Sequence, residues 1–248
     1  MREYLARYPD VLDERRAIVL AGPPGAGKST VLAEILGEDR DTWLPIDPDD
    51  VKRSLLEAAL CDGSYEEAIK PPEIAALEAT GDRFFPLEMA ALVHAESSYL
   101  ARQLRDESMD LGRNVVIDTV LSSPDDAVAL GERLAASGYT VEVIDVEVPY
   151  ELSAERIEKR WERSYLEALK GQDPHGGRWV PSEWARGVYD TDEARSRPEL
   201  AAARLAESCE AALRYRRFYT PAEDAPRRLE VDLSRAGVGH PLIATTGL

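Results

Sequence analysis

The sequence predicts an α/β fold in which a mostly parallel sheet carries helices on both faces, with an added helical elaboration. Two observations predict this fold class. Short apolar runs alternate with segments of helical periodicity, which is the pattern of parallel strands joined by crossover helices. A glycine-rich loop, Gly22–Thr30, also separates the first apolar run, 17–21, from the first helical segment, 30–36. Its sequence fits Gly-x-x-x-x-Gly-Lys-Ser, which indicates a P-loop NTPase fold of the kinase-like class.

The residue types in this loop suit the binding of phosphate. Glycines let the backbone curl so that its N–H groups point at an anion, and the N-terminus of the following helix adds partial positive charge. We expect Lys28 to reach the β- and γ-phosphates of ATP and the Ser29 hydroxyl to bind Mg²⁺. The predicted ATP site consists of Gly22, Pro23, Pro24, Gly25, Ala26, Gly27, Lys28, Ser29 and Thr30.

Length and composition favour one kinase domain over 1–233, followed by a loosely ordered tail, 234–248. Within the domain, 61–111 is predicted as the helical elaboration and 150–190 as a lid-like region. No apolar stretch approaches ~20 residues, the N-terminus lacks a secretory apolar region, and the two cysteines are far apart. These features predict a cytoplasmic protein without a membrane span.

The net charge of −17, from 47 acidic and 30 basic residues, argues against a nucleic acid as the main partner. The reason is that a phosphate backbone repels an acidic surface. A local basic pocket for a phosphorylated small molecule remains compatible with this charge. An acidic surface is also ordinary for a protein that stays in solution.

The first half of the chain is predicted to begin with an amphipathic helix over 1–16, ahead of the first strand. A short second strand, 43–46, leads into a turn in which Asp49 or Asp50 caps a helix over 51–60. Later helical segments are predicted over 65–69, 73–79 and 87–111.

The second half is predicted to add further strands. One of them, 140–148, alternates apolar and polar residues and is therefore expected to have one wetter face. Ser123 and Pro124 fit the cap and the first turn of a helix that runs to Ala136. The remaining segments are strands over 114–118 and 228–233, a charged helix over 152–168, a Gly- and Pro-rich loop over 171–181, and a helix over 198–219.

Carboxylates follow two of the predicted strands, and ligands bind at the carboxyl ends of strands in open parallel sheets. Asp47 and Asp49 follow one strand, and Asp49 is the candidate base that accepts a proton from an acceptor hydroxyl. Caps and turns are the alternative role for such aspartates. Asp118 ends the other strand as a Walker B carboxylate does, so it either binds Mg²⁺ or orients the acceptor, unless it is only a solvated strand end.

Arginines are expected to neutralise the transferring phosphoryl group. Arg178 follows Gly176 and Gly177, and a mobile glycine hinge with one arginine suits a closing lid. Trp179 either packs in that lid or anchors the loop on the core. Other candidates lie on the charged helix, where interleaved glutamates also fit a salt-bridged, solvated surface; they are Arg156, Arg160 and Arg163.

Two polar residues on the long predicted helix, His94 and Glu96, are candidates for a substrate contact. They lie two residues apart, so they do not share a helix face and do not form a metal pair. For His94 we favour a satisfied histidine in the core. The sequence indicates no partner for His175 or for His240.

The order and spacing of these motifs resemble the zeta toxins, P-loop kinases that phosphorylate UDP-N-acetylglucosamine. The resemblance covers about residues 16–182. Beyond the P-loop it rests on Ile46–Asp49, His94–Ser98, Asn114–Thr119, Gly138–Val141, Val148–Pro149, Arg160 and Gly177–Pro181.

The resemblance implies roles for individual residues. Asp49 corresponds to the base that takes the proton from a sugar hydroxyl, and Lys28, Arg160 and Arg178 correspond to cations that stabilise the phosphates. It also implies ATP and Mg²⁺ as cofactors, a sugar nucleotide as substrate and an antitoxin protein as a separate partner. The implied substrate contacts are Glu96, Asp118 and Thr119.

The chain departs from the family pattern at positions that concern the acceptor rather than ATP. Asp118 is shorter than the family's usual Glu, and 61–86 is longer than in the smallest members. Ala185 and Arg186 stand where a His-Asp pair often follows the lid. Two alternatives therefore stay open. One is a P-loop kinase for another acceptor, such as an antibiotic, gluconate, a nucleoside or a polynucleotide 5′-end, and the other is a non-catalytic nucleotide-binding module.

Overall fold

The computed structural model describes residues 2–245, and the chain divides into two compact units. The sheet unit combines Met1–Ile46, Gln103–Ser153 and Glu183–Leu248, and the helical unit combines Asp47–Arg102 and Ala154–Ser182. The helical unit overlaps both the predicted helical elaboration, 61–111, and the predicted lid-like region, 150–190. Met1 and the end of the predicted tail, 246–248, lie outside the described residues.

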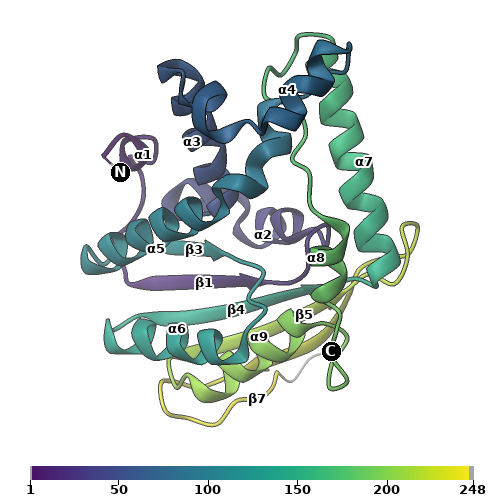
Figure 1. Ribbon diagram of the computed structural model, residues 1–248. Helices are drawn as coiled ribbons and strands as arrows, with labels where there is room; N and C mark the ends of the chain where they lie inside the picture. The colour runs from purple at the N-terminus through teal and green to yellow at the C-terminus, as the bar shows by residue number, and fades with distance from the viewer. Residues whose placement is uncertain (1, 246–248) are drawn as a thin grey trace. The chain divides into compact units, whose positions relative to one another are not determined.

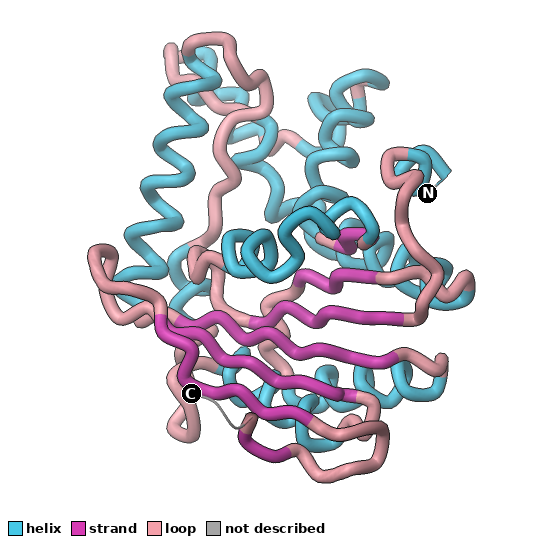
Figure 2. Tube along the Cα trace, turned by 180° about the vertical axis from the view of Figure 1, so that it is seen from behind, coloured by secondary structure: helices cyan, strands magenta, loops and turns pink. Residues whose placement is uncertain are grey.

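The described part of the sheet unit is built on a seven-stranded sheet of order β2-β3-β1-β4-β5-β6-β7 (Figure 2). The first five strands in this order run parallel, and β6 and β7 extend one edge in antiparallel pairs. This confirms the mostly parallel sheet of the predicted fold class. The strands are β1 (Arg16–Ala21), β2 (Leu44–Ile46), β3 (Val115–Asp118), β4 (Thr140–Glu147), β5 (Ala212–Tyr219), β6 (Arg228–Ser234) and β7 (Ile243–Ala244).

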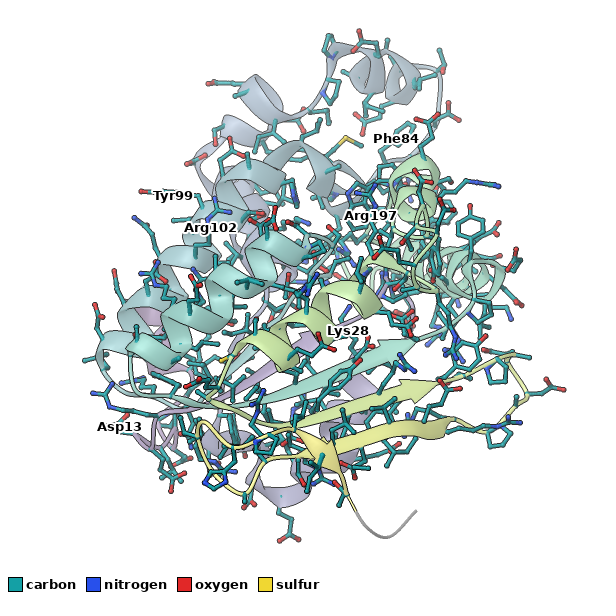
Figure 3. The ribbon with its side chains drawn as sticks, turned by 90° about the horizontal axis from the view of Figure 1, so that it is seen from below. Asp13, Lys28, Phe84, Tyr99, Arg102 and Arg197 are labelled. Carbon is teal, nitrogen blue, oxygen red and sulfur yellow. The ribbon has the colours of Figure 1, made fainter. Side chains whose placement is uncertain are left out.

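Helices cover both faces of this sheet, as predicted. On one face, α2 (Lys28–Leu36) packs Val31 and Leu32 into an apolar cluster with alternate residues of β1 and β4. On the other face, α6 (Pro124–Ala136) and α9 (Arg197–Ser208) lie side by side (Figures 1 and 3). The unit also contains α1 (Arg2–Ala6), the 3₁₀ helix η1 (Gly37–Thr42) and most of α8 (Ser182–Gly187).

The helical unit has its own apolar core, formed by buried residues that include Leu56, Tyr65, Leu87 and Val93. No helix of the described residues is long and apolar enough to cross a membrane. The unit's elements are α3 (Pro48–Asp62), the π-helical turn η2 (Tyr65–Ile69), α4 (Pro72–Ala79), the 3₁₀ helix η3 (Pro86–Val93), the first residues of α5 (His94–Asp110) and most of α7 (Tyr150–Leu169).

Two of the predicted helices are too long. The helix expected over 198–219 ends at Ser208, because Cys209 takes an extended conformation and the following residues pair with β4 as strand β5. The helix expected over 1–16 ends at Ala6, since the Leu12 backbone instead bonds to Thr42 and Asn114. Both errors follow from long-range backbone pairing, which helical periodicity does not reveal.

Other predicted features differ in detail. The single helix over 87–111 is two consecutive elements, η3 and α5. The strand β4 has no wetter face at its end, because Asp145 and Glu147 are fully buried. Within the predicted tail, the residues of β7 pair with β6. By contrast, Ser123 does cap α6, and its Oγ accepts a hydrogen bond from the Asp126 N–H.

Candidate active site

The phosphate loop of the sheet unit joins the end of β1 to the start of α2. Gly22, Gly25 and Gly27 all have positive φ angles, of 132°, 74° and 91°. A Cβ at Gly22 would lie 2.1 Å from the Val146 carbonyl oxygen of β4, so only glycine fits there. Gly27 caps α2 without a side chain, which leaves the first N–H groups of the helix facing the loop.

Lys28 and Asp118 come together beside this loop. The Lys28 ammonium donates to the Gly22 carbonyl at 3.0 Å and lies 3.7 Å from a carboxylate oxygen of Asp118. Parallel pairing of β1 with β3 sets Leu20 opposite Asp118 and so brings the carboxylate to the same end of the sheet. A side-chain amine and a carboxylate at the mouth of a glycine loop can bind a nucleotide phosphate and its divalent cation.

The neighbouring residues hold the loop and the strand end in place. Thr119 donates its N–H to the Leu20 carbonyl, and its hydroxyl accepts from the Leu121 N–H, so the hydroxyl braces the turn after β3. The buried hydroxyl of Ser153, at the start of α7, donates to the Pro24 carbonyl at 2.7 Å. Sequence reasoning missed Ser153, because 129 residues separate it from the loop.

In the helical unit, Asp49 is the centre of a charged cluster. Asp47, rather than Asp49 or Asp50, caps α3, since its side chain accepts from the Asp49 N–H at 2.8 Å. This leaves the Asp49 carboxylate to pair with Lys52 at 3.0 Å and with Arg178 at 2.5 Å. Burial acts to raise the pKa of Asp49, but the Arg178 and Lys52 charges outweigh it and hold that pKa below its usual range.

Two of the four candidate arginines, Arg160 and Arg178, act on Asp49 electrostatically. Arg160 keeps an exposed surface, but partial desolvation and the adjacent Arg178 charge lower its pKa, against the opposing effect of Asp49 and Asp47. Arg163 is exposed on α7, and Arg156 is half-buried there. The cluster thus joins residues from α3, α7 and the loop after α7.

Lys52 is a site residue that sequence reasoning missed. Its side chain is only 9% exposed although it carries a charge, and it lies one helical turn after Asp49. The i, i+3 spacing was the available signal, because residues at that spacing share a helix face. After Arg178, Lys52 is the second charge that lowers the pKa of Asp49.

His94 is not a core histidine, so that prediction was wrong. The side chain is exposed at the start of α5, where partial burial and the Lys52 charge lower its pKa and Asp49 acts in the opposite direction. Glu96 is exposed on the same helix. Among the described residues, no three His, Cys, Asp or Glu side chains gather as metal ligands would.

A zeta toxin family model matches residues 71–202, which is more than half of the 248-residue chain. The chain belongs to the zeta toxin family. This confirms the family resemblance found in the sequence. The matched region includes Asp118, Arg160 and Arg178 but begins after the P-loop and Asp49.

Solved structures with the same fold include chains of two protein assemblies. A chain of the AvrRxo1-ORF1:AvrRxo1-ORF2 crystal structure with sulphate ions gives a TM-score of 0.62 at 20% identity, covering 99% of this chain and 67% of that one. The structure of the same pair with ATP gives 0.56 at 19% identity, covering 98% and 63%. A chain from the PezAT toxin–antitoxin system of Streptococcus pneumoniae gives 0.59 at 17% identity, covering 93% and 78%. At these identities the likeness shows the fold alone, a mostly parallel sheet with helices.

One curated protein matches a short part of the sequence. A guanylate kinase of Prochlorococcus marinus (strain MIT 9312) is 50% identical over 34 residues, which are 14% of this chain and 18% of that kinase. The match spans less than a fifth of the relative.

Proposed function

We propose that the protein is an ATP-dependent kinase of zeta-toxin type that phosphorylates a sugar hydroxyl of UDP-N-acetylglucosamine. The observation that carries this proposal is the ionised Asp49 held by Arg178 and Lys52, with Arg160 nearby, in a family of P-loop kinases. A carboxylate surrounded by cations suits an acceptor hydroxyl that must lose a proton while a phosphoryl group arrives.

The donor half of the proposed site is the phosphate loop, Gly22–Thr30. Its left-handed glycines and the bare start of α2 fit a nucleotide phosphate chain, and a related fold has been crystallised with ATP. The Ser29 hydroxyl and the Asp118 carboxylate are oxygen donors of the type that Mg²⁺ prefers, so these residues would hold the ion. Bound Mg²⁺ would neutralise charge on the phosphates, and Lys28 would neutralise more of it.

The acceptor half of the proposed site is the Asp49 cluster. Asp49 would orient the sugar hydroxyl and take its proton, while Arg160 and Arg178 stabilise charge on the transferring group. A lowered pKa makes Asp49 a weak base, which is compatible with a loose transition state in which positioning dominates. Glu96, Asp118 and Thr119 are proposed to contact the sugar nucleotide.

The test is to incubate the protein with ATP, Mg²⁺ and a panel of sugar nucleotides and to detect products by mass. We expect one added phosphoryl group on UDP-N-acetylglucosamine and ATP consumption that depends on it. Transfer only to another hydroxyl compound would keep the kinase and replace the acceptor. Tight ATP binding with no transfer to any acceptor would favour a non-catalytic nucleotide-binding module instead.

We also propose a protein partner of antitoxin type. The support is that chains of the same fold occur as AvrRxo1-ORF1 with ORF2 and in the PezAT toxin–antitoxin system. A kinase that consumes ATP and a sugar nucleotide would act in the cytoplasm, where both are made. Co-purification of the tagged protein with the product of an adjacent reading frame would test this partner.

A further inference from the structure

The loop that carries Arg178 is attached to α3 through His175. The His175 ring is only 18% exposed, and its Nδ1 lies 3.2 Å from both an Arg53 nitrogen and an Asp173 carboxylate oxygen. Its Nε2 lies 3.5 Å from the Glu57 carboxylate. Arg53 also pairs with Asp173 at 3.6 Å. Each ring nitrogen therefore has a polar partner, and two of these partners come from α3.

The same side of α3 carries Asp49. Asp49, Arg53 and Glu57 follow one another at intervals of four residues, so they form a row along one helix face. The first member of the row pairs with Arg178, and the next two meet His175. The loop is thus held to one face of α3 at two successive points.

Packing fixes the segment between these two points. A Cβ at Gly176 would lie 2.4 Å from the Phe85 Cβ, and one at Gly177 would lie 2.5 Å from the Trp161 carbonyl oxygen. At both positions only glycine leaves room for the neighbouring residue. From the sequence, these glycines were instead expected to form a mobile hinge. On the far side of Arg178, Trp179 packs edge-on against Trp161 at 5.4 Å.

A backbone hydrogen bond adds a third attachment. The Leu87 N–H donates to the His175 carbonyl at 2.9 Å, and the His175 N–H donates to the Asp173 carboxylate at 2.9 Å. The carboxylate of Asp173 therefore contacts both the backbone N–H and the ring of His175. Loss of the ring would remove its contacts with Arg53 and Glu57 on α3, while the Arg53–Asp173 and Arg178–Asp49 pairs keep both of their side chains.

We propose that His175, with Arg53, Glu57 and Asp173, is a positioning cluster that sets Arg178 against Asp49 in the acceptor half of the site. This inference rests on the proposed kinase function. Arginine at a transferring phosphoryl group is useful only in the correct geometry, and a displacement of about 1 Å can cost up to ~10²-fold in rate. The cluster would act on the rate through Arg178 and would not touch the substrate.

The experiment compares His175→Ala with the matched control His240→Ala, whose histidine is exposed in the sheet unit. We expect His175→Ala to lower kcat about tenfold with little change in the KM for ATP, and His175→Gln, which keeps an N–H toward Glu57, to recover part of the loss. In an Arg178→Ala background, His175→Ala should cause no further loss, because its effect passes through Arg178. A wild-type rate in His175→Ala, or an equal loss in both backgrounds, would overturn the proposal.

A second readout separates this inference from the kinase proposal. Hydrogen exchange at the Leu87 amide and over 171–181 should accelerate in His175→Ala and stay unchanged in His240→Ala. If the wild type transfers phosphate to no acceptor, the kinase proposal fails, and faster exchange in His175→Ala still supports the attachment of the loop. Unchanged exchange in that variant overturns the attachment whatever the activity.

Discussion

The phosphate loop of the sheet unit is formed mainly by backbone groups, whereas the Asp49 cluster of the helical unit is formed by side chains. The loop is nine consecutive residues whose glycines shape a backbone surface. The cluster consists of side chains from three elements, with Asp49 and Arg178 far apart in the sequence. A backbone surface recognises what all nucleotides share, whereas a side-chain cluster can change residue by residue. In the proposed kinase, the loop would therefore bind the donor and the cluster would select the acceptor.

Replacing Lys28 should have the largest effect, because it removes the loop's one side-chain cation. We expect Lys28→Ala to lower the transfer rate by about 10²–10³-fold, as loss of a transition-state donor does, and also to weaken ATP binding. Calorimetry with ATP and a steady-state transfer assay measure the two effects. Normal ATP affinity with normal transfer in this variant would contradict the assignment of the donor half.

The donor half could be predicted from the sequence almost completely, because its information is local. Strand, glycines, lysine and helix start follow one another in the sequence, and the structure arranges them in that order. Asp118 was predicted from its place at a strand end, and parallel pairing with β1 brings it to Lys28.

Replacing Asp49 should lower phosphoryl transfer without changing ATP binding, and so test the two halves of the proposed site separately. We expect Asp49→Asn to lower transfer by roughly 10²-fold, since a positioned base contributes at least that much, while ATP affinity stays as in the wild type. The amide is nearly isosteric, so α3 and its Asp47 cap should remain folded, which circular dichroism can verify. Transfer at the wild-type rate would exclude Asp49 as the base. Loss of ATP binding would show that Asp49 also contributes to the donor half of the site.

The acceptor half was predicted only in part. Asp49, Arg160 and Arg178 were candidates, but only the family resemblance, and not the residue pattern of the helix, distinguished Arg160 from Arg163, and His175 had no visible partner. Such contacts depend on where α3, α7 and a loop meet. A pattern of residue types along one segment does not contain that information.

Replacing Lys52 should change the pH dependence more than the rate. Lys52 helps to hold the pKa of Asp49 below its usual range, so Lys52→Met should raise that pKa and move the acidic limb of kcat/KM to higher pH by about one unit. Lys159→Met is the matched control, because Lys159 is half exposed and pairs with Glu155 on α7. An acidic limb that does not move would show that Asp49 does not control the profile.

The smallest effect on transfer is expected from a pair of buried acids on β4 of the sheet unit. Asp145 and Glu147 are fully buried two residues apart on β4, and burial favours a proton on their carboxyl groups. Ser196 donates to Glu147, and Tyr215 donates to Asp145. The sequence predicted one wetter face here, because alternation of polar and apolar residues does not reveal that α9 covers the strand. Burial raises the pKa of Asp145 to about 7 and raises that of Glu147 well above its usual range.

The acid pair should make stability depend on pH in a direction opposite to that of most carboxylates. A raised folded-state pKa stabilises the protein fully below the unfolded value of 3.8, and this contribution is lost as pH rises toward about 7. Asp145→Asn keeps a neutral partner for Glu147 at every pH. Its free energy of unfolding relative to wild type should therefore increase between these pH values, by on the order of 1 kcal/mol per pH unit. Denaturant unfolding across this range measures the difference, with Glu142→Gln, a carboxylate of the same strand that pairs with Arg216, as control. A difference that stays constant with pH would mean that the pair holds no extra proton in the folded state, and that β4 tolerates two buried charges beside the phosphate loop.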